Sequence, residues 1–496
     1  MKLDIPKEVS EIAAKLTAAG YLSYLVGGSV RDLLLNRTPK DWDIATNAKP
    51  DEIQKLFSDS VYENEFGTVG VKTRSDDPTL AVVEVTTFRE EESYSDFRHP
   101  DKVKFADTIE KDLARRDFTV NAMALDAKGW TVDPYGGETD LDKKLIRAVG
   151  DPDRRFKEDA LRLIRAVRFA SELGGFSAKG GPASGWKIEE KTAEAIKRNS
   201  ALLGKISAER VRDELTKLIM SDNSGPKEGV EQLEEFGLLY YILPELREGI
   251  GVTQNKHHIY TVWEHSLRAL DYSAHHGAPL EIRLASLLHD VGKPRAKQGE
   301  GPDSTFYGHE AVGARMTRVI LGRLRFSNKV IDQVTHLVRH HLFYYNVGEV
   351  TAAGVRRFLS RVGSENIDDL IKVRESDRVG SGVPKAVPYK LRHLRFMLEK
   401  VKTDPISPKM LAIDGNDVME LLAVPPSPRI GFILGILLED VLDDPNKNTS
   451  KNLEARARGL NELSDAKLAE LAEKAKGKKD ESQQGIEEEM KKKYYV

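Results

Sequence analysis

Residues 25–46 read LVGGSVRDLLLNRTPKDWDIAT, and this stretch decides the fold of the first part of the chain. The apolar residues that end at Val26 predict a short strand, and Gly27 and Gly28 predict a tight turn. Residues 30–35 have the apolar spacing of a helix that starts directly after the turn. Because the first N–H groups of a helix lack partners within it, this turn is suited to a phosphate group.

A second predicted strand carries two acidic residues, Asp41 and Asp43, on either side of Trp42. Side chains two residues apart on a strand point to the same face. Such a pair can hold two Mg2+ ions about 4 Å apart, the arrangement that nucleotidyl transfer uses. A Gly-Gly turn or an Asp-x-Asp pair alone is usually an ordinary turn or an exposed strand edge. The two together, at this separation, favour the chemical interpretation.

Composition narrows the class of protein. A chain of 496 residues is long enough for about three or four domains. The absence of cysteine excludes disulfides, thiolate metal sites and cysteine catalysis, so any metal must be bound by His, Asp or Glu. No apolar run reaches the ~18 residues of a membrane span, and we expect a cytoplasmic protein without a membrane partner. The net charge of −3 predicts no general attraction to nucleic acid, so RNA would need a local basic surface.

The periodicity divides the chain into four blocks. Residues 1–150 alternate helix and strand patterns, and residues 80–87 are strand-like, whereas residues 89–111 are polar with little regular pattern. Residues 151–250 are helical apart from a Gly-rich insertion near 174–186. Residues 251–385 are helical and rich in histidine, and residues 386–496 are helical with a Lys- and Glu-rich tail. We therefore predict an α+β head followed by mostly α-helical domains.

Residues 25–46 resemble the class II nucleotidyltransferases of the polymerase beta superfamily, which include bacterial tRNA CCA-adding enzymes and poly(A) polymerases. The resemblance implies that the head is polymerase-beta-like and that Mg2+ is bound by Asp41 and Asp43, with Glu84 as a third catalytic carboxylate. It also implies a triphosphate site formed by Gly27, Gly28, Ser29, Arg31 and Asp32.

A second charged motif lies at residues 114–123, ARRDFTVNAM. On its own it is typical of a surface ion-pair cluster. It closely resembles the second motif of the same family, however. The resemblance implies that the nucleotide sugar and phosphates are bound by Arg115, Arg116, Asp117 and Asn121.

A third motif lies on the predicted helix 151–170. One face of that helix is charged, and it carries Glu158, Asp159, Arg162 and Arg165; the opposite face is apolar, and it carries Ala160, Leu163, Val167 and Ala170. These charges could simply pair with one another, for about 0.3 kcal/mol. Alternatively, Asp159 could accept from the exocyclic amine of cytosine or adenine while Arg162 donates to the neighbouring ring nitrogen. Guanine and uracil present a carbonyl instead of the amine. The sequence Glu-Asp-x-x-Arg resembles the motif that selects nucleotides in the family, which implies base contacts by Asp159, Arg162 and Arg165.

The histidine-rich block contains LLHDVGKP at residues 287–294 and resembles the HD-domain metal phosphohydrolases. A single histidine of this kind is most often a structural residue. The resemblance implies that a divalent metal is bound by His265, His289, Asp290 and Asp377, and that a second metal or a phosphate is bound by His309, His340 and His341. Imidazole and carboxylate ligands suit Mn2+, Fe2+, Co2+, Ni2+ or Zn2+, and the sequence does not choose among them.

The resemblance covers nearly all of residues 20–450. It implies template-independent addition of C, C and A to the 3′ end of tRNA from CTP and ATP, together with phosphohydrolysis by the HD domain. A poly(A) polymerase and an enzyme that adds only CC or only A remain alternatives. An alternative of another class is an HD nucleotide hydrolase whose degenerate transferase serves only to bind RNA. No DNA partner is expected, and the oligomeric state stays open.

Overall fold

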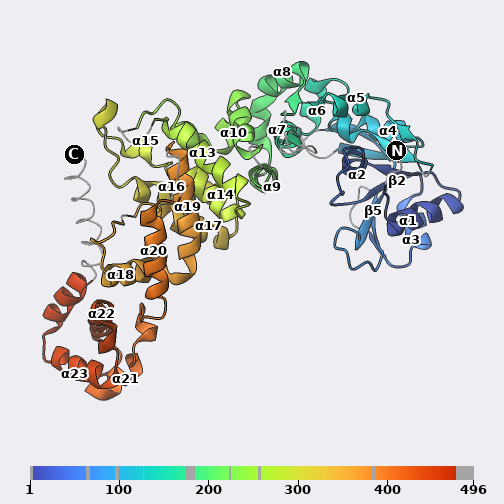
Figure 1. Ribbon diagram of the computed structural model, residues 1–496. Coiled ribbons are helices and arrows are strands. Elements are labelled where there is room, and N and C mark those ends of the chain that lie inside the picture. Colours follow the sequence, from blue (N-terminus) through green and yellow to red (C-terminus); the bar gives the residue numbers. More distant parts are fainter. Residues whose placement is uncertain are drawn as a thin grey trace. The chain divides into compact units, whose positions relative to one another are not determined.

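A computed structural model describes residues 4–62, 67–94, 100–126, 128–174, 185–222, 225–254, 259–343, 345–382 and 387–475. The chain divides into two compact units: unit 1 contains the chain up to Arg247 together with Leu321–Phe326, and unit 2 contains the remainder. A mixed sheet followed by helices confirms the α+β prediction (Figure 1). Most of the insertion predicted near 174–186, and the charged tail beyond residue 475, lie outside the described residues. The four-block division stays a prediction.

The head of unit 1 is built on one seven-stranded sheet, with strand order β3-β4-β5-β2-β1-β8-β9. Its strands are β1 (Ser23–Val26), β2 (Asp43–Thr46), β3 (Ser60–Tyr62), β4 (Thr68–Lys72), β5 (Val82–Thr87), β8 (Ala124–Asp126) and β9 (Thr131–Val132). Strands β2 and β5 are parallel, whereas the other neighbours are antiparallel. The helices of this region are α1 (Lys7–Ala18), α2 (Gly28–Leu34), α3 (Pro50–Leu56), α4 (Ile109–Ala114) and α5 (Gly137–Asp142), with the 3-10 turn η1 (Thr119–Asn121).

The predicted strand, turn and helix at residues 25–46 are present. Gly27 has φ +73°, a backbone conformation that favours glycine, and α2 begins at the next residue. The Ser29 hydroxyl donates to the Val26 carbonyl at 2.8 Å and thereby closes the turn. Strand β2 begins at Asp43, so Asp41 lies just before the strand that was predicted to contain it.

The polar segment at residues 89–111 is more regular than its sequence predicts. Strands β6 (Arg89–Tyr94) and β7 (Pro100–Phe105) pair in antiparallel register as a hairpin. The prediction of little regular structure is therefore wrong for this segment. The pairing joins two short stretches through their backbones, which polar composition does not reveal.

The single helix predicted over residues 151–170 is also wrong, because it is interrupted at Asp159. Helix α6 (Pro152–Glu158) ends there with Asp159 in an extended conformation, φ −139° and ψ 106°, and α7 (Leu161–Gly174) begins two residues later. The Asp159 carboxylate accepts from the Leu161 N–H at 3.0 Å, so the side chain satisfies a free donor at the start of α7. The apolar face is buried as predicted, and it comprises Ala160, Leu163, Val167 and Ala170.

The rest of unit 1 is mainly helical and contains α8 (Glu190–Asn199), η2 (Ser200–Lys205), α9 (Ala208–Ile219), α10 (Gly225–Glu235), α11 (Leu239–Ile242) and α12 (Pro244–Arg247). A short parallel pair interrupts the predicted all-helical pattern and joins β10 (Leu145–Ile146) to β11 (Lys187–Ile188). Helix α7 packs against both α9 and α10. These contacts bring α9 close to the interruption at Asp159.

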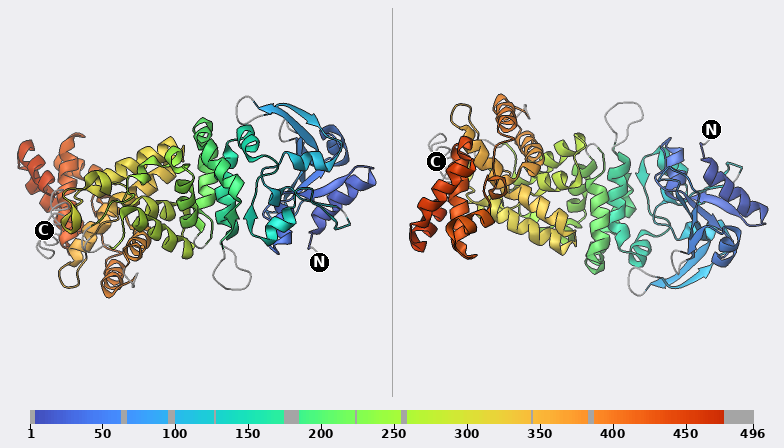
Figure 2. Two further views of the ribbon diagram at one scale, coloured as in Figure 1. Left: turned by 90° about the horizontal axis from the view of Figure 1, so that it is seen from above. Right: turned by 90° about the horizontal axis from the view of Figure 1, so that it is seen from below.

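Unit 2 is mainly helical in its described residues, with an isolated antiparallel bridge between Gln298 and Thr305, and Figure 2 shows its helices from two further sides. Its first helices are α13 (Val262–His275), α14 (Leu280–Leu288), α15 (Lys293–Ala296), α16 (His309–Arg323), α17 (Asn328–His340), α18 (Ala352–Val362) and α19 (Ile367–Gly380). The last residues of α16, from Leu321, belong to unit 1. The remaining helices are α20 (Tyr389–Lys400), α21 (Gly415–Leu422), α22 (Pro428–Asp443) and α23 (Ser450–Asn461). The 3-10 turns are η3 (Gly301–Asp303), η4 (Ser364–Asn366), η5 (Pro408–Met410) and η6 (Pro445–Lys447). Helix α13 packs against α14 and α19, whereas α21, α22 and α23 share a separate apolar core.

Among the described residues, none of the helices combines the length and the apolar character needed to cross a lipid bilayer.

Candidate functional site

Three predicted carboxylates and two arginines meet at the turn between β1 and α2. The parallel register of β2 and β5 places Asp43 beside Glu84. A methyl group on Gly27 would lie 3.4 Å from Asp43 Oδ2 and 2.8 Å from Arg116 Nη1. A methyl group on Gly28 would lie 3.9 Å from Asp41 Oδ1 and 3.7 Å from Arg31 Nη2. The two glycines therefore leave open the space that these charged groups face.

The electrostatics of this turn suit a divalent cation. Burial, together with the negative charges of Asp41 and Glu84, raises the pKa of Asp43 to about 7, although Arg116 opposes the shift. A bound cation would favour the ionised carboxylate and so reverse this shift. Carboxylate oxygens are the ligands that Mg2+ prefers. Asp41, Asp43 and Glu84 thus fit the metal that the resemblance implies.

The arginines of the second motif are oriented by a residue that the sequence analysis missed. Asp112 on α4 is 1% exposed and accepts from Arg115 Nε at 3.0 Å and Nη2 at 2.8 Å. Its other oxygen accepts from Arg116 Nη2 at 3.3 Å. Spacings of three and four residues on a helix are the signal that could have identified Asp112.

A buried chain of hydrogen bonds connects the turn to α7. Arg31 Nη1 donates to the side-chain oxygen of Asn121 at 2.8 Å, and Asn121 Nδ2 donates to Asp117 at 3.1 Å. Arg165 on α7 donates to the second oxygen of Asp117 through Nε at 2.9 Å and Nη2 at 2.5 Å. Although burial raises the pKa of Asp117, the Arg165 guanidinium and the Asn121 amide hold it well below its usual value. Asp32 accepts from Arg31 Nε at 2.9 Å and so orients the same guanidinium.

A second missed carboxylate, Glu214 on α9, supports this chain from the other side. It is 3% exposed and accepts from Arg168 Nε at 2.5 Å and from Arg165 Nη1 at 3.5 Å. Arg165 therefore lies between two carboxylates. Glu214 is remote in sequence from both arginines, and local periodicity carries no signal for it.

The residues predicted to select the base have separate partners. Arg162 donates to Glu158 Oε2 at 2.9 Å and to the carbonyls of Arg155 and Arg115 at 3.1 and 3.0 Å. The Arg162–Glu158 contact is the ion pair that the sequence left open as an alternative, but it joins α6 to α7 across the interruption at Asp159. Asp159 Oδ2 instead accepts from Arg210 Nη2 on α9 at 2.8 Å. Arg210 was not predicted.

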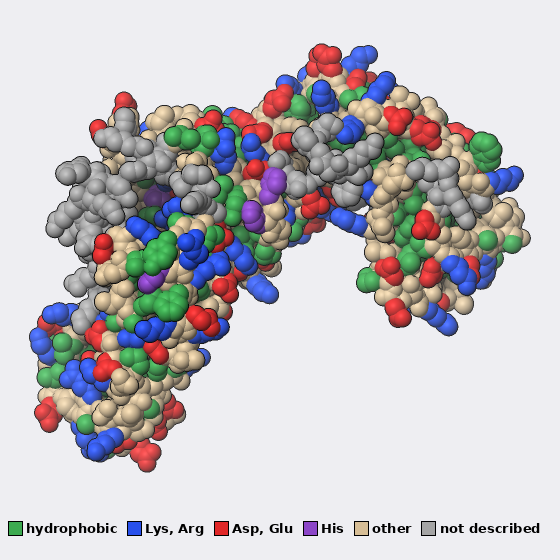
Figure 3. Space-filling view, in the orientation of Figure 1, with side chains coloured by type: hydrophobic (Ala, Val, Ile, Leu, Met, Phe, Trp, Pro, Cys, Tyr) green, Lys and Arg blue, Asp and Glu red, His purple; other side chains and the backbone are tan. Residues whose placement is uncertain are grey.

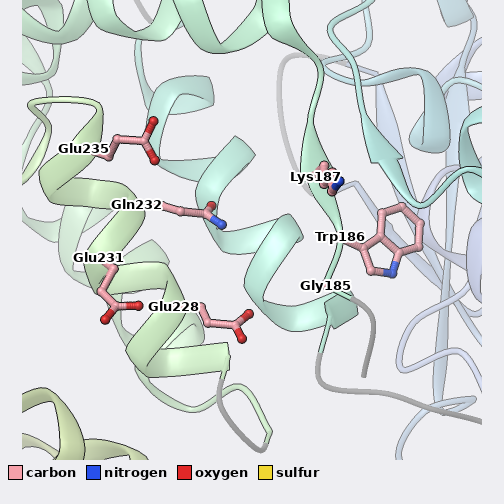
Figure 4. A pocket seen from close by; sticks show the side chains of 7 residues that line it. All are labelled: Gly185, Trp186, Lys187, Glu228, Glu231, Gln232 and Glu235. Carbon is pink, nitrogen blue, oxygen red and sulfur yellow. The ribbon is translucent and has the colours of Figure 1, made fainter. Parts of the chain in front are cut away.

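A pocket of about 350 Å³ lies between β11 and α10 and is drawn in Figure 4. Its lining comprises Gly185, Trp186, Lys187, Glu228, Glu231, Gln232 and Glu235. None of the predicted site residues is in this lining. Three glutamates against one lysine would repel a triphosphate, so the pocket does not compete with the turn as the nucleotide site.

The predicted HD residues of unit 2 form a buried cluster centred on Asp290. Nε2 of His265 and of His289 lie 3.0 and 3.2 Å from Asp290 Oδ2. Nε2 of His309 and of His341 lie 3.4 and 3.6 Å from the other oxygen, Oδ1. The carboxylate thus faces two histidine pairs, and each pair with Asp290 forms a group able to hold a metal ion.

Asp377 and Lys293 complete the cluster. Asp377 Oδ1 lies 3.3 Å from His265 Nε2, and Lys293 Nζ lies 2.7 Å from Asp290 Oδ2. Burial lowers the pKa of His289, but Asp290 and Asp377 outweigh it and raise the pKa to about 10. A bound divalent cation would oppose this shift and favour the neutral imidazole. Imidazoles and carboxylates in two groups are then the donors that a divalent transition metal takes.

His340 does not join either metal-binding group among the described residues. Its ring packs against His336 with centroids 4.6 Å apart, and burial lowers its pKa to about 3. The neighbouring His341 faces Asp290 instead, because adjacent residues on α17 and its C-terminal end point in different directions. Sequence adjacency did not distinguish the two histidines.

Three family models match the chain. They are described as poly A polymerase head domain over residues 23–147, probable RNA and SrmB-binding site of polymerase A over residues 185–250, and HD domain over residues 262–379. The nucleotidyltransferase and HD domains both imply dependence on divalent metal ions. The family resemblance noted from the sequence is confirmed.

Relatives of known name are similar to most of the chain or to about half of it. The CCA-adding enzyme of Enterococcus faecalis is 32% identical over 459 residues, which cover 90% of this chain and 94% of the relative. The CCA-adding enzyme of Ligilactobacillus salivarius is 44% identical over 236 residues, which cover 47% of this chain and 54% of the relative. Among solved structures, the Bacillus stearothermophilus CCA-adding enzyme in complex with CTP has a TM-score of 0.68 and 29% identity, covering 92% of this chain and 97% of that chain.

Proposed function

The chain belongs to the family of CCA-adding enzymes, and from that premise we propose that it adds C, C and A in steps to the 3′ end of tRNA, using CTP and ATP. The observation that carries the proposal is the meeting of Asp41, Asp43, Arg31 and Arg116 at the Gly27–Gly28 turn. Acidic and basic groups face one open space there, as binding of metal and triphosphate requires. The proposed location is the cytoplasm, where tRNA and both nucleotides are available.

We propose Mg2+ as the metal, bound by Asp41 and Asp43 with Glu84 beside them. When bound, Mg2+ would neutralise triphosphate charge and favour the ionised form of the attacking 3′ hydroxyl. Arg31 and Arg116 would donate to phosphate oxygens, and their orientation is set by Asp32, Asn121 and Asp112. The carboxylates of Asp32 and Asp112 thus act through the arginines.

The proposed choice of C and A relies on Asp159. Its carboxylate can accept from the amine that cytosine and adenine share and would repel the carbonyl of uracil or guanine. Arg165 carries positive charge beside this carboxylate. Burial lowers the pKa of Arg165, but Asp117 and Glu214 outweigh it and raise the pKa, and the negative charge of Asp159 adds to the rise.

An exposed helix face supports RNA as the partner. On α20, Tyr389 and Phe396 are each 62% exposed, and their rings lie on either side of His393 at 5.9 Å between centroids. Lys390 and Arg392 are exposed on the same helix. Figure 3 shows hydrophobic and basic side chains intermixed over the part of unit 2 that Figure 1 labels α20. Aromatic rings among basic groups suit contacts to RNA bases and phosphates.

The test uses the purified protein with tRNA transcripts that lack CCA, end in C, or end in CC, each given one labelled nucleotide. Addition of C, C and one A supports the proposal. A long run of A would identify a poly(A) polymerase, and addition confined to C or to A would identify a partial enzyme. Asp43→Ala should abolish addition and leave tRNA binding nearly unchanged, since phosphate contacts dominate RNA affinity. An active Asp43→Ala variant would contradict the two-metal assignment.

We also propose that the HD cluster is a metal phosphohydrolase centre, with Mn2+, Ni2+ or Co2+ as candidate metals. The supporting observation is that Asp290 faces two histidine pairs within a buried site. A bound metal would activate water toward a phosphate ester, and Lys293 would balance the charge of Asp290. The candidate substrate is a terminal or 2′,3′-cyclic phosphate on a tRNA end, because such a group blocks the hydroxyl to be extended. Metal content, phosphate release from a terminal phosphate and ring opening of a 2′,3′-cyclic phosphate are measured before and after dialysis against a chelator. Hydrolysis that persists after the metal is removed would exclude this centre.

A further inference from the structure

The lysine of the HD cluster is already engaged by protein groups. Lys293 is 7% exposed, and its ammonium donates to Asp290 Oδ2 at 2.7 Å and to Gln254 Oε1 at 2.6 Å. Two of its three donors are thus used within the protein, and little of the side chain reaches solvent. Binding of a substrate phosphate therefore needs other cations beside the cluster.

Two arginines lie beside the predicted metal ligand Asp377 on α19. Arg374 and Arg378 are four residues apart, so their side chains lie on one side of the helix. Arg374 Nη1 donates to Asp377 Oδ2 at 2.5 Å, while Oδ1 of the same carboxylate lies 3.3 Å from His265 Nε2. One carboxylate therefore separates the Arg374 guanidinium from the histidines of the cluster.

Both guanidinium groups have donors that the protein does not use. Within the part of the chain that the structure describes, Asp377 is the one hydrogen-bond acceptor of Arg374, and the Arg374 side chain is 24% exposed. The Nε atom of Arg378 is buried and has no hydrogen-bond partner among the same residues. A buried donor without an acceptor is costly, so an acceptor supplied by a ligand is favoured at this position.

The like charges of the two arginines also favour an anion between them. Burial and the charge of Arg374 both lower the pKa of Arg378, whereas the charge of Asp377 opposes the shift. A bound anion would supply a second negative charge and offset the repulsion between the guanidinium groups. Phosphate suits this position, because a planar guanidinium can donate to two phosphate oxygens at once.

A terminal phosphate fits the arginine pair better than a cyclic phosphate does. Near pH 7 a phosphate monoester carries a charge of about −1.5 to −2 and has three free oxygens. A 2′,3′-cyclic phosphate is a diester, with a single negative charge and two free oxygens. Two guanidinium groups complement the larger charge and the larger number of acceptors.

We propose that Arg374 and Arg378 bind the phosphate group of the HD substrate and favour a terminal phosphate over a cyclic one. This inference rests on the proposed phosphohydrolase function of the HD cluster. It assigns phosphate binding to the helix that supplies Asp377, and to two residues outside the histidine and aspartate set predicted from the sequence.

The experiment uses the full-length protein, loaded with Mn2+ and freed of excess metal, and compares Arg378→Ala and Arg374→Lys with the wild type. Calorimetry gives the dissociation constant of inorganic phosphate, and hydrolysis of RNA ends with a terminal or a 2′,3′-cyclic phosphate gives KM and kcat. Arg378→Ala should weaken phosphate binding and raise KM for the terminal phosphate by about tenfold or more, the usual effect of losing a hydrogen bond between charged groups. The rise in KM should be smaller for the cyclic phosphate.

The second variant separates phosphate binding from support of the metal. Arg374→Lys keeps a positive charge beside Asp377 and loses the planar guanidinium, so it should retain the metal and bind phosphate more weakly. The matched control is Arg318→Ala, which removes an exposed arginine of unit 2 that pairs with Asp332 at 2.8 Å. Its constants should equal those of the wild type. Phosphate bound at the Gly27–Gly28 turn of unit 1 contributes equally in every protein.

Wild-type phosphate affinity and KM in both arginine variants would show that the inference is wrong. Loss of metal in step with phosphate affinity would mean that the arginines only position Asp377, which would also overturn it. An equal rise in KM for the two kinds of RNA end would overturn the preference for a terminal phosphate. A wild-type protein that hydrolyses neither end would instead refute the proposed phosphohydrolase, and the affinity for inorganic phosphate would still test the arginine pair.

Discussion

The substitution Asp117→Asn tests whether the buried hydrogen bonds between the Gly27–Gly28 turn and α7 stabilise the head against local opening. The amide has the shape of the carboxylate and can still accept from the Phe118 N–H, which lies 2.8 Å from Asp117 Oδ1. It lacks the charge that Arg165 contacts through two nitrogens at 2.9 and 2.5 Å. Glu214 is a second carboxylate in ion-pair contact with Arg165, at 3.5 Å.

The expected decrease in the free energy of unfolding follows from the burial of the Asp117–Arg165 ion pair. Removing one partner of a buried ion pair costs about 3–5 kcal/mol. We take the lower end, about 3 kcal/mol, because Glu214 remains and the Arg165 side chain is 29% exposed. Local opening of α7 and of η1 should then become about a hundredfold more frequent.

Hydrogen exchange measured by mass spectrometry reports this opening peptide by peptide, so the behaviour of unit 2 does not obscure it. The control is Asp153→Asn, which removes the charge from a solvent-exposed pair with Arg198 and should leave exchange unchanged. Addition of C and of A should fall together in Asp117→Asn, since Asp117 orients the Arg31 guanidinium through Asn121 and is not itself a predicted base contact. Exchange equal to that of the control would refute the reasoning.

Three further outcomes are expected. Gly27→Ala should abolish nucleotide addition because the added methyl group would lie 2.8 Å from Arg116 Nη1. Gly20 also has a positive φ but has open space around it, so Gly20→Ala should remain active. Equal activity of the two variants would contradict the proposed steric cause. His289→Ala should lose metal and phosphate release while retaining nucleotide addition, which is measured on the same preparation, and a folded variant without addition would contradict two independent sites. Unit 1 should lose stability as the pH falls below about 4, because the pKa of Asp117 is lower in the folded than in the unfolded state. The contribution of Asp117 to stability is complete above the unfolded pKa and is lost progressively as the pH falls toward the folded pKa. An unchanged pH dependence of unfolding in Asp117→Asn would contradict this assignment.

Much of the head could be predicted because its signals are local. The strand, turn and helix at residues 25–46 follow from apolar spacing and from a glycine pair, and both depend on near neighbours. The buried stripe of α7 was predicted from periodicity alone. The hairpin at residues 89–105 was missed because its strands are joined by backbone pairing between polar segments. The interruption at Asp159 was missed because an aspartate at that position satisfies a helix start better than it continues a helix.

The candidate sites likewise combine features that local sequence patterns predict with features that depend on the tertiary structure. The sequence by itself determined the residue types, the family and the strand that carries Asp43, because motifs and periods of two or 3.6 are properties of short segments. Only the tertiary structure decided that Asp159 meets Arg210, a residue 51 positions away, and that His341 rather than His340 faces Asp290. Pairing between charged side chains depends on which helices pack together and on how far each group is buried. Those are properties of the folded chain, and no local pattern specifies them.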